Sequence, residues 1–216
     1  MAFTLPNGST FDFAASAGTA VAITAITNAN PAVATAAGHD LADGDVIVVT
    51  SGWSKLTGRT VRVTDVTTDS FALEGINTTN TQRYPAGAGK GSFSQVLTWV
   101  QIPQITEVAT SGGDQQFLTF GFLEDDDDRQ IPTTKSPASM TITVADDPSQ
   151  PYVPVVEEAD EAKEVRAQRL NLPNGDVILY NSIPSITSTP SLSRNNLMTR
   201  AISLALQGRV TRYSAA

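Results

Sequence analysis

The sequence predicts a mainly β protein: a β-sandwich or barrel with one flanking α-helix, interrupted by a small inserted antiparallel β-barrel. Three observations support this fold class. Thr, Val and Ile are abundant and fall in short runs that alternate with polar residues. This composition and this alternation are typical of half-buried β-strands. Clusters of Gly, Asn and Pro separate these runs at short intervals. Residues 151–167 differ, because they combine helix-forming residues with few turn signals.

The strands between Thr19 and Gly91 are expected to be short. Residues 45–50 form an apolar run ahead of Ser-Gly, which is typical of a buried strand, and Val61 and Val63 alternate with polar residues. Regular short strands with Gly and Asn turns favour a small barrel. We therefore expect an inserted barrel domain over residues 19–90, within a larger domain made of residues 1–18 and 91–216.

Beyond Gly91 the expected strands lengthen. Residues 95–102 carry apolar side chains on both faces, so both faces are expected to be covered. Residues 104–110 and 116–123, joined by Ser-Gly-Gly-Asp, are predicted to form a hairpin. Residues 140–144 and 197–206 alternate in the manner of further strands.

One helix is predicted over residues 153–163, with Lys163 and Arg166 placed late, as the helix dipole favours. Its expected buried stripe consists of Val155, Ala159, Ala162 and Val165. A strand through residues 169–172 follows. Pro173-Asn-Gly-Asp176 then predicts a tight hairpin turn into residues 177–180.

Composition and charge exclude several classes of function. The chain has 216 residues, 22 acidic against 14 basic, a net charge of −8, one histidine and no cysteine. Thiol nucleophiles, disulfides and Cys-based zinc sites are therefore excluded. An acidic balance disfavours tight nucleic-acid binding. No run of about 18 apolar residues and no charged amino-terminal leader is present, so we expect neither a membrane protein nor a secreted precursor.

The single histidine is a candidate catalytic residue. His39, oriented by Asp40 and beside Ser51 or Ser54 as nucleophile, suggests a hydrolase, but the favoured interpretation is a surface histidine in a barrel loop. No nucleophile elbow, phosphate-binding loop or metalloprotease helix is present. We expect no enzyme, no catalytic residue and no metal or other cofactor.

Trp53 and Tyr84 suggest a sugar-stacking platform, which would make the inserted barrel a glycan-binding module. Aromatic side chains that fill a barrel core or anchor a loop are the more common arrangement. We favour that interpretation.

An acidic loop gives the strongest local signal. It comprises Glu124, Asp125, Asp126, Asp127 and Asp128, and Arg129 follows it. Consecutive carboxylates repel one another and resist packing, and their spacing lacks the pattern of a calcium loop. Three interpretations stay open: a solvated loop, an electrostatic loop that contacts another subunit or lines a channel, and a metal site.

Several segments together resemble tail tube proteins of long-tailed bacteriophages. They are Thr4-Leu-Pro-Asn-Gly-Ser9, Thr110-Ser-Gly-Gly-Asp-Gln-Gln-Phe117, Phe122-Leu-Glu-Asp-Asp-Asp-Asp128 and Leu170-Asn-Leu-Pro-Asn-Gly-Asp176. Residues 22–61 resemble a small β-barrel that is inserted into many phage structural proteins. The resemblance covers roughly residues 1–18 and 91–216 for the tube domain.

The resemblance implies a structural virion protein that assembles with itself into hexameric rings, which stack into a hollow tail. DNA would pass through this tube without specific binding. Tape measure, tail terminator and baseplate proteins are the further partners it implies. The implied location is the virion tail, after assembly in the host cytoplasm. In the alternative interpretation, the inserted barrel would be a binding module on the tail surface that contacts host glycans.

Overall fold

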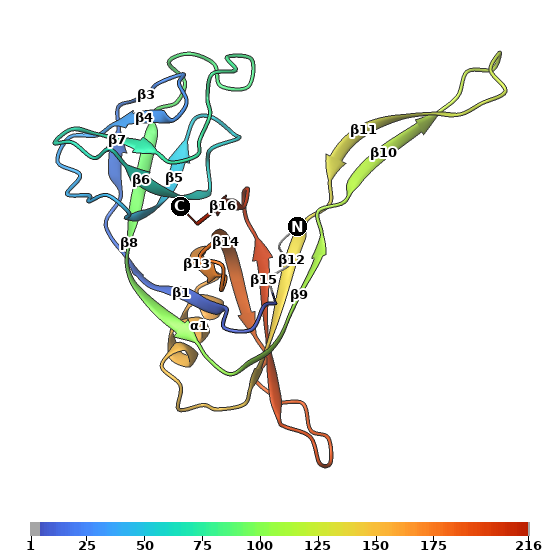
Figure 1. Cartoon of the computed structure of the whole chain (residues 1–216). Coiled ribbons are helices and arrows are strands. Elements are labelled where there is room, and N and C mark those ends of the chain that lie inside the picture. Colours follow the sequence, from blue (N-terminus) through green and yellow to red (C-terminus); the bar gives the residue numbers. More distant parts are fainter. Residues whose placement is uncertain (1–4, 216) are drawn as a thin grey trace.

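The computed structural model describes residues 5–215, and among them the chain forms sixteen strands and one helix (Figure 1). The mainly β fold class predicted from the sequence is confirmed. The elements are β1 (Thr10–Ala17), β2 (Val21–Ile23), β3 (Ala25–Ile26), β4 (Ala32–Thr35), β5 (Val46–Ser51), β6 (Arg59–Thr64), β7 (Ser70–Leu73), β8 (Gly91–Ile102), β9 (Ile105–Gly112), β10 (Gln115–Phe120), β11 (Arg129–Lys135), β12 (Ala138–Ala145), α1 (Tyr152–Glu161), β13 (Arg166–Asn171), β14 (Val177–Ile186), β15 (Thr199–Leu206) and β16 (Thr211–Tyr213).

The larger layer is an antiparallel sheet in the order β8-β1-β13-β14-β15-β12-β9. Strand β1 from the start of the chain lies between β8 and β13, so its neighbours come from much later in the sequence. Phe11 and Phe13 of β1, Ile142 of β12 and Ile202 of β15 are almost fully buried in one core. Leu97 of β8, expected to be covered, is 56% exposed instead.

Helix α1 covers this core, as predicted, but its ends and its buried face differ from the expectation. It spans Tyr152–Glu161, and its buried residues are Tyr152, Val153, Val156 and Ala159. The chain leaves the helix after Ala162, and Lys163 has a φ of +52°. Ala162 and Val165 consequently lie outside the helix and are exposed, and Lys163 and Arg166 do not sit in its last turn.

Strands β2 to β7 enclose a second core in the 19–90 segment. Its buried side chains include Ile47, Leu56, Val61 and Phe71, and Phe93 of β8 joins them. Strand β8 pairs with β5 and β2 through its first half and with β1 through its second half. A single long strand therefore runs from one core to the other.

Polar contacts join the 19–90 segment to β14 and β16. The Tyr213 hydroxyl accepts from the Arg62 amide at 2.8 Å and donates to the Glu74 carbonyl at 3.2 Å. Thr60 Oγ1 donates to the Tyr180 carbonyl at 3.1 Å. Burial raises the pKa of Tyr213, which keeps its hydroxyl neutral and able to act as both donor and acceptor.

The prediction that residues 104–123 form a hairpin is wrong. Strand β9 pairs with β12, in register from Ala138 with Gly112, whereas β10 pairs with β11. Gly112 and Gly113 have φ values of +77° and +80° and redirect the chain outward instead of reversing it. The tight hairpin at residues 173–176 is confirmed, since β13 and β14 pair directly across it.

Candidate assembly surface

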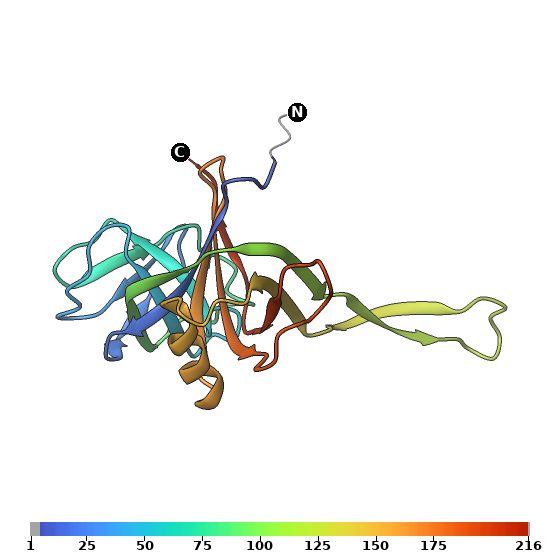
Figure 2. The ribbon, with the colours of Figure 1, turned by 90° about the horizontal axis from the view of Figure 1, so that it is seen from below.

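Residues 115–135, here called the arm, project from the body of the molecule in both views (Figures 1 and 2). Every residue of β11 and most of β10 is exposed. Large apolar side chains along the arm are 50–107% exposed: Phe117, Leu118, Phe122, Leu123 and Ile131. A lone two-stranded hairpin is marginally stable in water, and contiguous exposed apolar surface marks interaction sites. These properties are those of a contact surface.

The register of the arm places its apolar residues in pairs. Leu118 stands opposite Ile131, and Phe117 stands opposite Pro132. Directly opposed side chains lie on the same face of a two-stranded sheet, so each face of the arm carries an apolar pair. Each face therefore offers apolar area to a partner.

The five predicted site residues, Glu124, Asp125, Asp126, Asp127 and Asp128, occupy the tip of the arm, between β10 and β11. Asp125 forms an ion pair of 2.8 Å with Arg129. The Arg129 guanidinium also lies over the Phe122 ring, 5.9 Å from its centre. The structure thus brings the five carboxylates to one exposed turn with one compensating cation.

The charge of this tip is large for its size. Residues 124–129 carry five carboxylates and one guanidinium, so −5 + 1 gives −4. Within residues 5–215 no three carboxylate or histidine groups converge in a way that could hold a metal ion. The tip is an exposed surface of strong negative charge.

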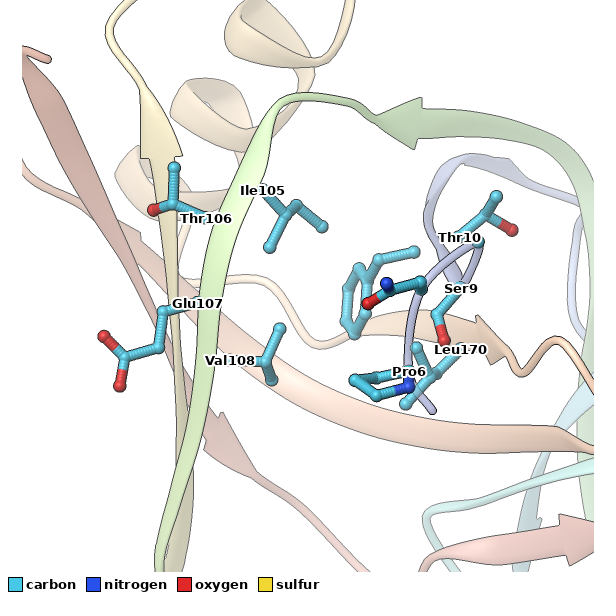
Figure 3. A pocket seen from close by; sticks show the side chains of 11 residues that line it. Pro6, Ser9, Thr10, Ile105, Thr106, Glu107, Val108 and Leu170 are labelled. Atoms are coloured by element: carbon cyan, nitrogen blue, oxygen red, sulfur yellow. The ribbon is translucent and has the colours of Figure 1, made fainter. Parts of the chain in front are cut away.

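A free sheet edge is the second exposed feature. Strand β9 ends the sheet and, among the described residues, pairs with β12 alone. Beside it lies a groove of about 470 Å³ between β9 and the amino-terminal segment. Ile105 and Val108 point across this groove toward Pro6 and Leu170, and Glu107 points away (Figure 3). An unpaired edge with an adjacent groove is open to pairing with another chain.

His39 is not the surface histidine expected from the sequence. It is only 6% exposed and packs edge-on against Phe71, with ring centres 5.3 Å apart. Its Nδ1 accepts a hydrogen bond from the Leu41 amide at 3.1 Å. Gly38 and Asp40, on either side, both have positive φ, and this turn folds the imidazole into the core.

Trp53 and Tyr84 are buried, at 2% and 7% exposure. Their rings pack edge to face, 5.2 Å between centres, and Trp53 Nε1 donates to the Pro85 carbonyl at 2.8 Å. The Ser51 hydroxyl donates to the Gly89 carbonyl at 3.1 Å. These aromatic rings therefore anchor a loop, as favoured from the sequence, and offer no open face on which a sugar could stack.

Sequence reasoning missed the second strand of the arm and the groove. Pro132 is a signal against a strand at residues 129–135, because proline lacks a ladder donor, although proline is tolerated at an edge. The groove depends on contact between residues 6–11 and β9, which are nearly a hundred positions apart. No local signal could have found it.

The one helix among the described residues is too short and too polar to span a membrane. The family model described as "Phage tail tube protein, TTP" matches residues 51–215. None of the curated proteins matches the chain.

Among solved structures, a chain of the PVC sheath–tube complex of an extracellular contractile injection system is 20% identical, with a TM-score of 0.40, over 53% of this chain and 83% of that one. A chain of the anti-feeding prophage tube-terminating cap is 23% identical, with a TM-score of 0.37, over 53% of this chain and 83% of that one. Because the family model spans well over half of the sequence, the chain belongs to the phage tail tube protein family and is a structural component of the virion tail.

Proposed function

We propose that this chain assembles head to tail into hexameric rings, and that the rings stack into the hollow tube through which phage DNA passes. The observation that carries the proposal is the arm, whose apolar side chains remain exposed in the single chain. The arm and the free β9 edge are different surfaces, so contacts that use them are heterologous. Such contacts close into a ring when the rotation between subunits permits.

The acidic balance fits passage of DNA without binding. Six copies of a chain with a net charge of −8 give 6 × −8 = −48 per ring, whereas DNA is held by clustered lysine and arginine. The proposed role involves no catalysis. Tape measure, tail terminator and baseplate proteins are the proposed contacts at the ends of the tube, and assembly takes place in the host cytoplasm.

Electron microscopy of the purified full-length protein tests this function. We expect rings or tubes that become more abundant as protein concentration rises. A protein that stays monomeric at every concentration and salt level contradicts the proposal.

The acidic loop is proposed as a contact between subunits. Replacing Asp125, Asp126, Asp127 and Asp128 by Asn should lower tube yield at low salt and remove its salt dependence, because exposed charge pairs are screened within about 10 Å at 0.1 M salt. Sedimentation of tubes across a salt series measures both effects. The matched control removes four charges elsewhere, at Asp65, Asp69, Glu158 and Glu161. Equal behaviour of the loop variant and wild type would leave the loop as solvated surface.

We also propose that residues 19–90 form an inserted domain and that residues 1–18 and 91–216 form the tube domain. Each part has a buried core of its own, which supports this division, and a smaller apolar cluster that includes Val46 and Tyr213 lies between the two parts. Strands β1 and β8 pair antiparallel up to Ala17 and Val96, so the chain can be closed by a short turn once the segment between them is removed.

Deleting residues 21–90 and inserting two glycines should leave a protein that folds. We expect a single cooperative urea transition and the circular dichroism of a β protein. Its stability should fall, because Tyr180 and Tyr213 lose the segment that covers them. A variant without any cooperative transition would show that the two cores fold only together.

A further inference from the structure

Four arginines make no ion pair within residues 5–215, although the other six each contact a carboxylate. They are Arg59, Arg83, Arg194 and Arg209. Arg83 lies in a loop of the 19–90 segment, and Arg194 lies in the connection between β14 and β15. Arg59 and Arg209, by contrast, are neighbours although 150 positions separate them.

Close backbone packing brings these two arginines together. Gly208, with a φ of +73°, sits directly on Gly58: a Cβ on Gly208 would lie 2.5 Å from the Gly58 carbonyl oxygen. Asn181 Nδ2 donates to that same carbonyl at 3.1 Å. Only glycine permits this approach, so the next residues, Arg59 and Arg209, are held side by side.

Arg59 is fixed in place and Arg209 is free to reach outward. Arg59 Nε donates to Thr211 Oγ1 at 3.2 Å. Burial lowers the pKa of Arg59, and the positive charge of Arg209 lowers it further. Arg209 itself is exposed. We call this pair the Arg59/Arg209 patch.

Surrounding charges do not neutralise the patch. Arg62 pairs with Glu74, and Arg212 pairs with Asp176 at 2.5 Å, so these cations are already compensated. Lys55, four residues before Arg59 in the sequence, is exposed and makes no ion pair within residues 5–215. The patch is therefore a local excess of cation in a chain of net charge −8.

We propose that the acidic loop of one copy docks on the Arg59/Arg209 patch of a second copy. This inference rests on the proposed function, in which the arm joins subunits. The tip carries −4 and the patch carries uncompensated positive charge, so the two surfaces are complementary. Each also has an exposed apolar residue next to its charges: Leu123 beside the acidic loop and Val210 beside Arg209.

The contact must be made between chains. Figure 1 shows the arm projecting away from β6 and β16, and Figure 2 places the arm and the 19–90 segment at opposite ends of the molecule. The tip of an arm cannot reach the patch of its own chain. An arm on one side and its receptor on the other is the arrangement of a head-to-tail contact.

Charge reversal in full-length protein tests the pairing. Because close charge pairs at interfaces govern both encounter and specificity, we expect Arg209→Glu to lower tube yield about tenfold or more. Asp126→Lys with Asp127→Lys should lower it similarly, and all three substitutions together should restore it. Arg83→Glu and Arg194→Glu are the matched controls and should leave yield unchanged. Melting temperatures of the single variants confirm that they fold; if Arg209→Glu does not, Arg209→Gln replaces it.

Three results would overturn the proposal. In the first, Arg209→Glu assembles like wild type although removal of the arm stops assembly; the arm then joins subunits through another receptor, and the proposed function survives. In the second, Arg194→Glu or Arg83→Glu blocks assembly, and adding Asp126→Lys with Asp127→Lys restores it. In the third, the wild type binds a short fluorescent DNA duplex, Arg209→Glu does not, and both form tubes equally, which makes the patch a nucleic-acid contact.

Discussion

Replacing residues 115–135 by an Asn-Gly turn is expected to give a folded monomer that forms no tubes. The ends of the arm are already close, since the Ser136 amide donates to the Asp114 carbonyl at 2.9 Å, and Asn-Gly suits a two-residue hairpin loop. No arm residue belongs to a buried core. The body should therefore keep its stability, whereas assembly loses the exposed apolar pairs and the acidic tip.

Sedimentation and electron microscopy measure the loss of tubes. Urea unfolding measures the free energy of unfolding of the remaining protein. A milder variant, Leu118→Ser with Ile131→Ser, keeps the arm but removes one apolar pair and should give an intermediate yield. Normal tubes from the shortened protein would contradict the role of the arm and, with it, the proposed docking of its tip.

Phe13→Ala is expected to cost about 3–5 kcal/mol in the free energy of unfolding, because it leaves a cavity in a closed core. Phe13 is 0% exposed and lies on β1 between Val100 of β8 and Gln168 of β13. Domains are typically stable by about 5–15 kcal/mol, so a large share of the protein should be unfolded or aggregated. Urea unfolding followed by tryptophan fluorescence checks this value.

The matched control is the same substitution in the arm. Phe117 is 54% exposed, and Phe117→Ala should change the free energy of unfolding by no more than about 0.5 kcal/mol. It should nevertheless reduce tube yield. Equal destabilisation by the two substitutions would mean that the arm packs on the body in solution.

Local signals in the sequence predicted the parts that depend on neighbours along the chain. Helix composition located α1 within two residues at each end, and Pro-Asn-Gly located the turn between β13 and β14. Alternation identified β12 and β15. The acidic loop stood out because five consecutive carboxylates have no place in a core.

Other features depend on strand partners that the sequence pattern does not name. Two glycines between residues 104–110 and 116–123 are as compatible with a reversal as with a bend, and the structure has the bend because β12, about thirty residues later, pairs with β9. His39 likewise lies in a polar turn, yet the positive φ of its neighbours directs its ring into the core.

The sequence by itself determined the β class, the single helix, the absence of cysteine chemistry and the position of the acidic loop along the chain. Only the tertiary structure decided that this loop stands at the tip of a projecting arm, that β9 is a free edge, and that Arg59 meets Arg209. The reason is physical: a period of two residues fixes which face of a strand is buried, but its partner is chosen by contacts between distant parts of the chain.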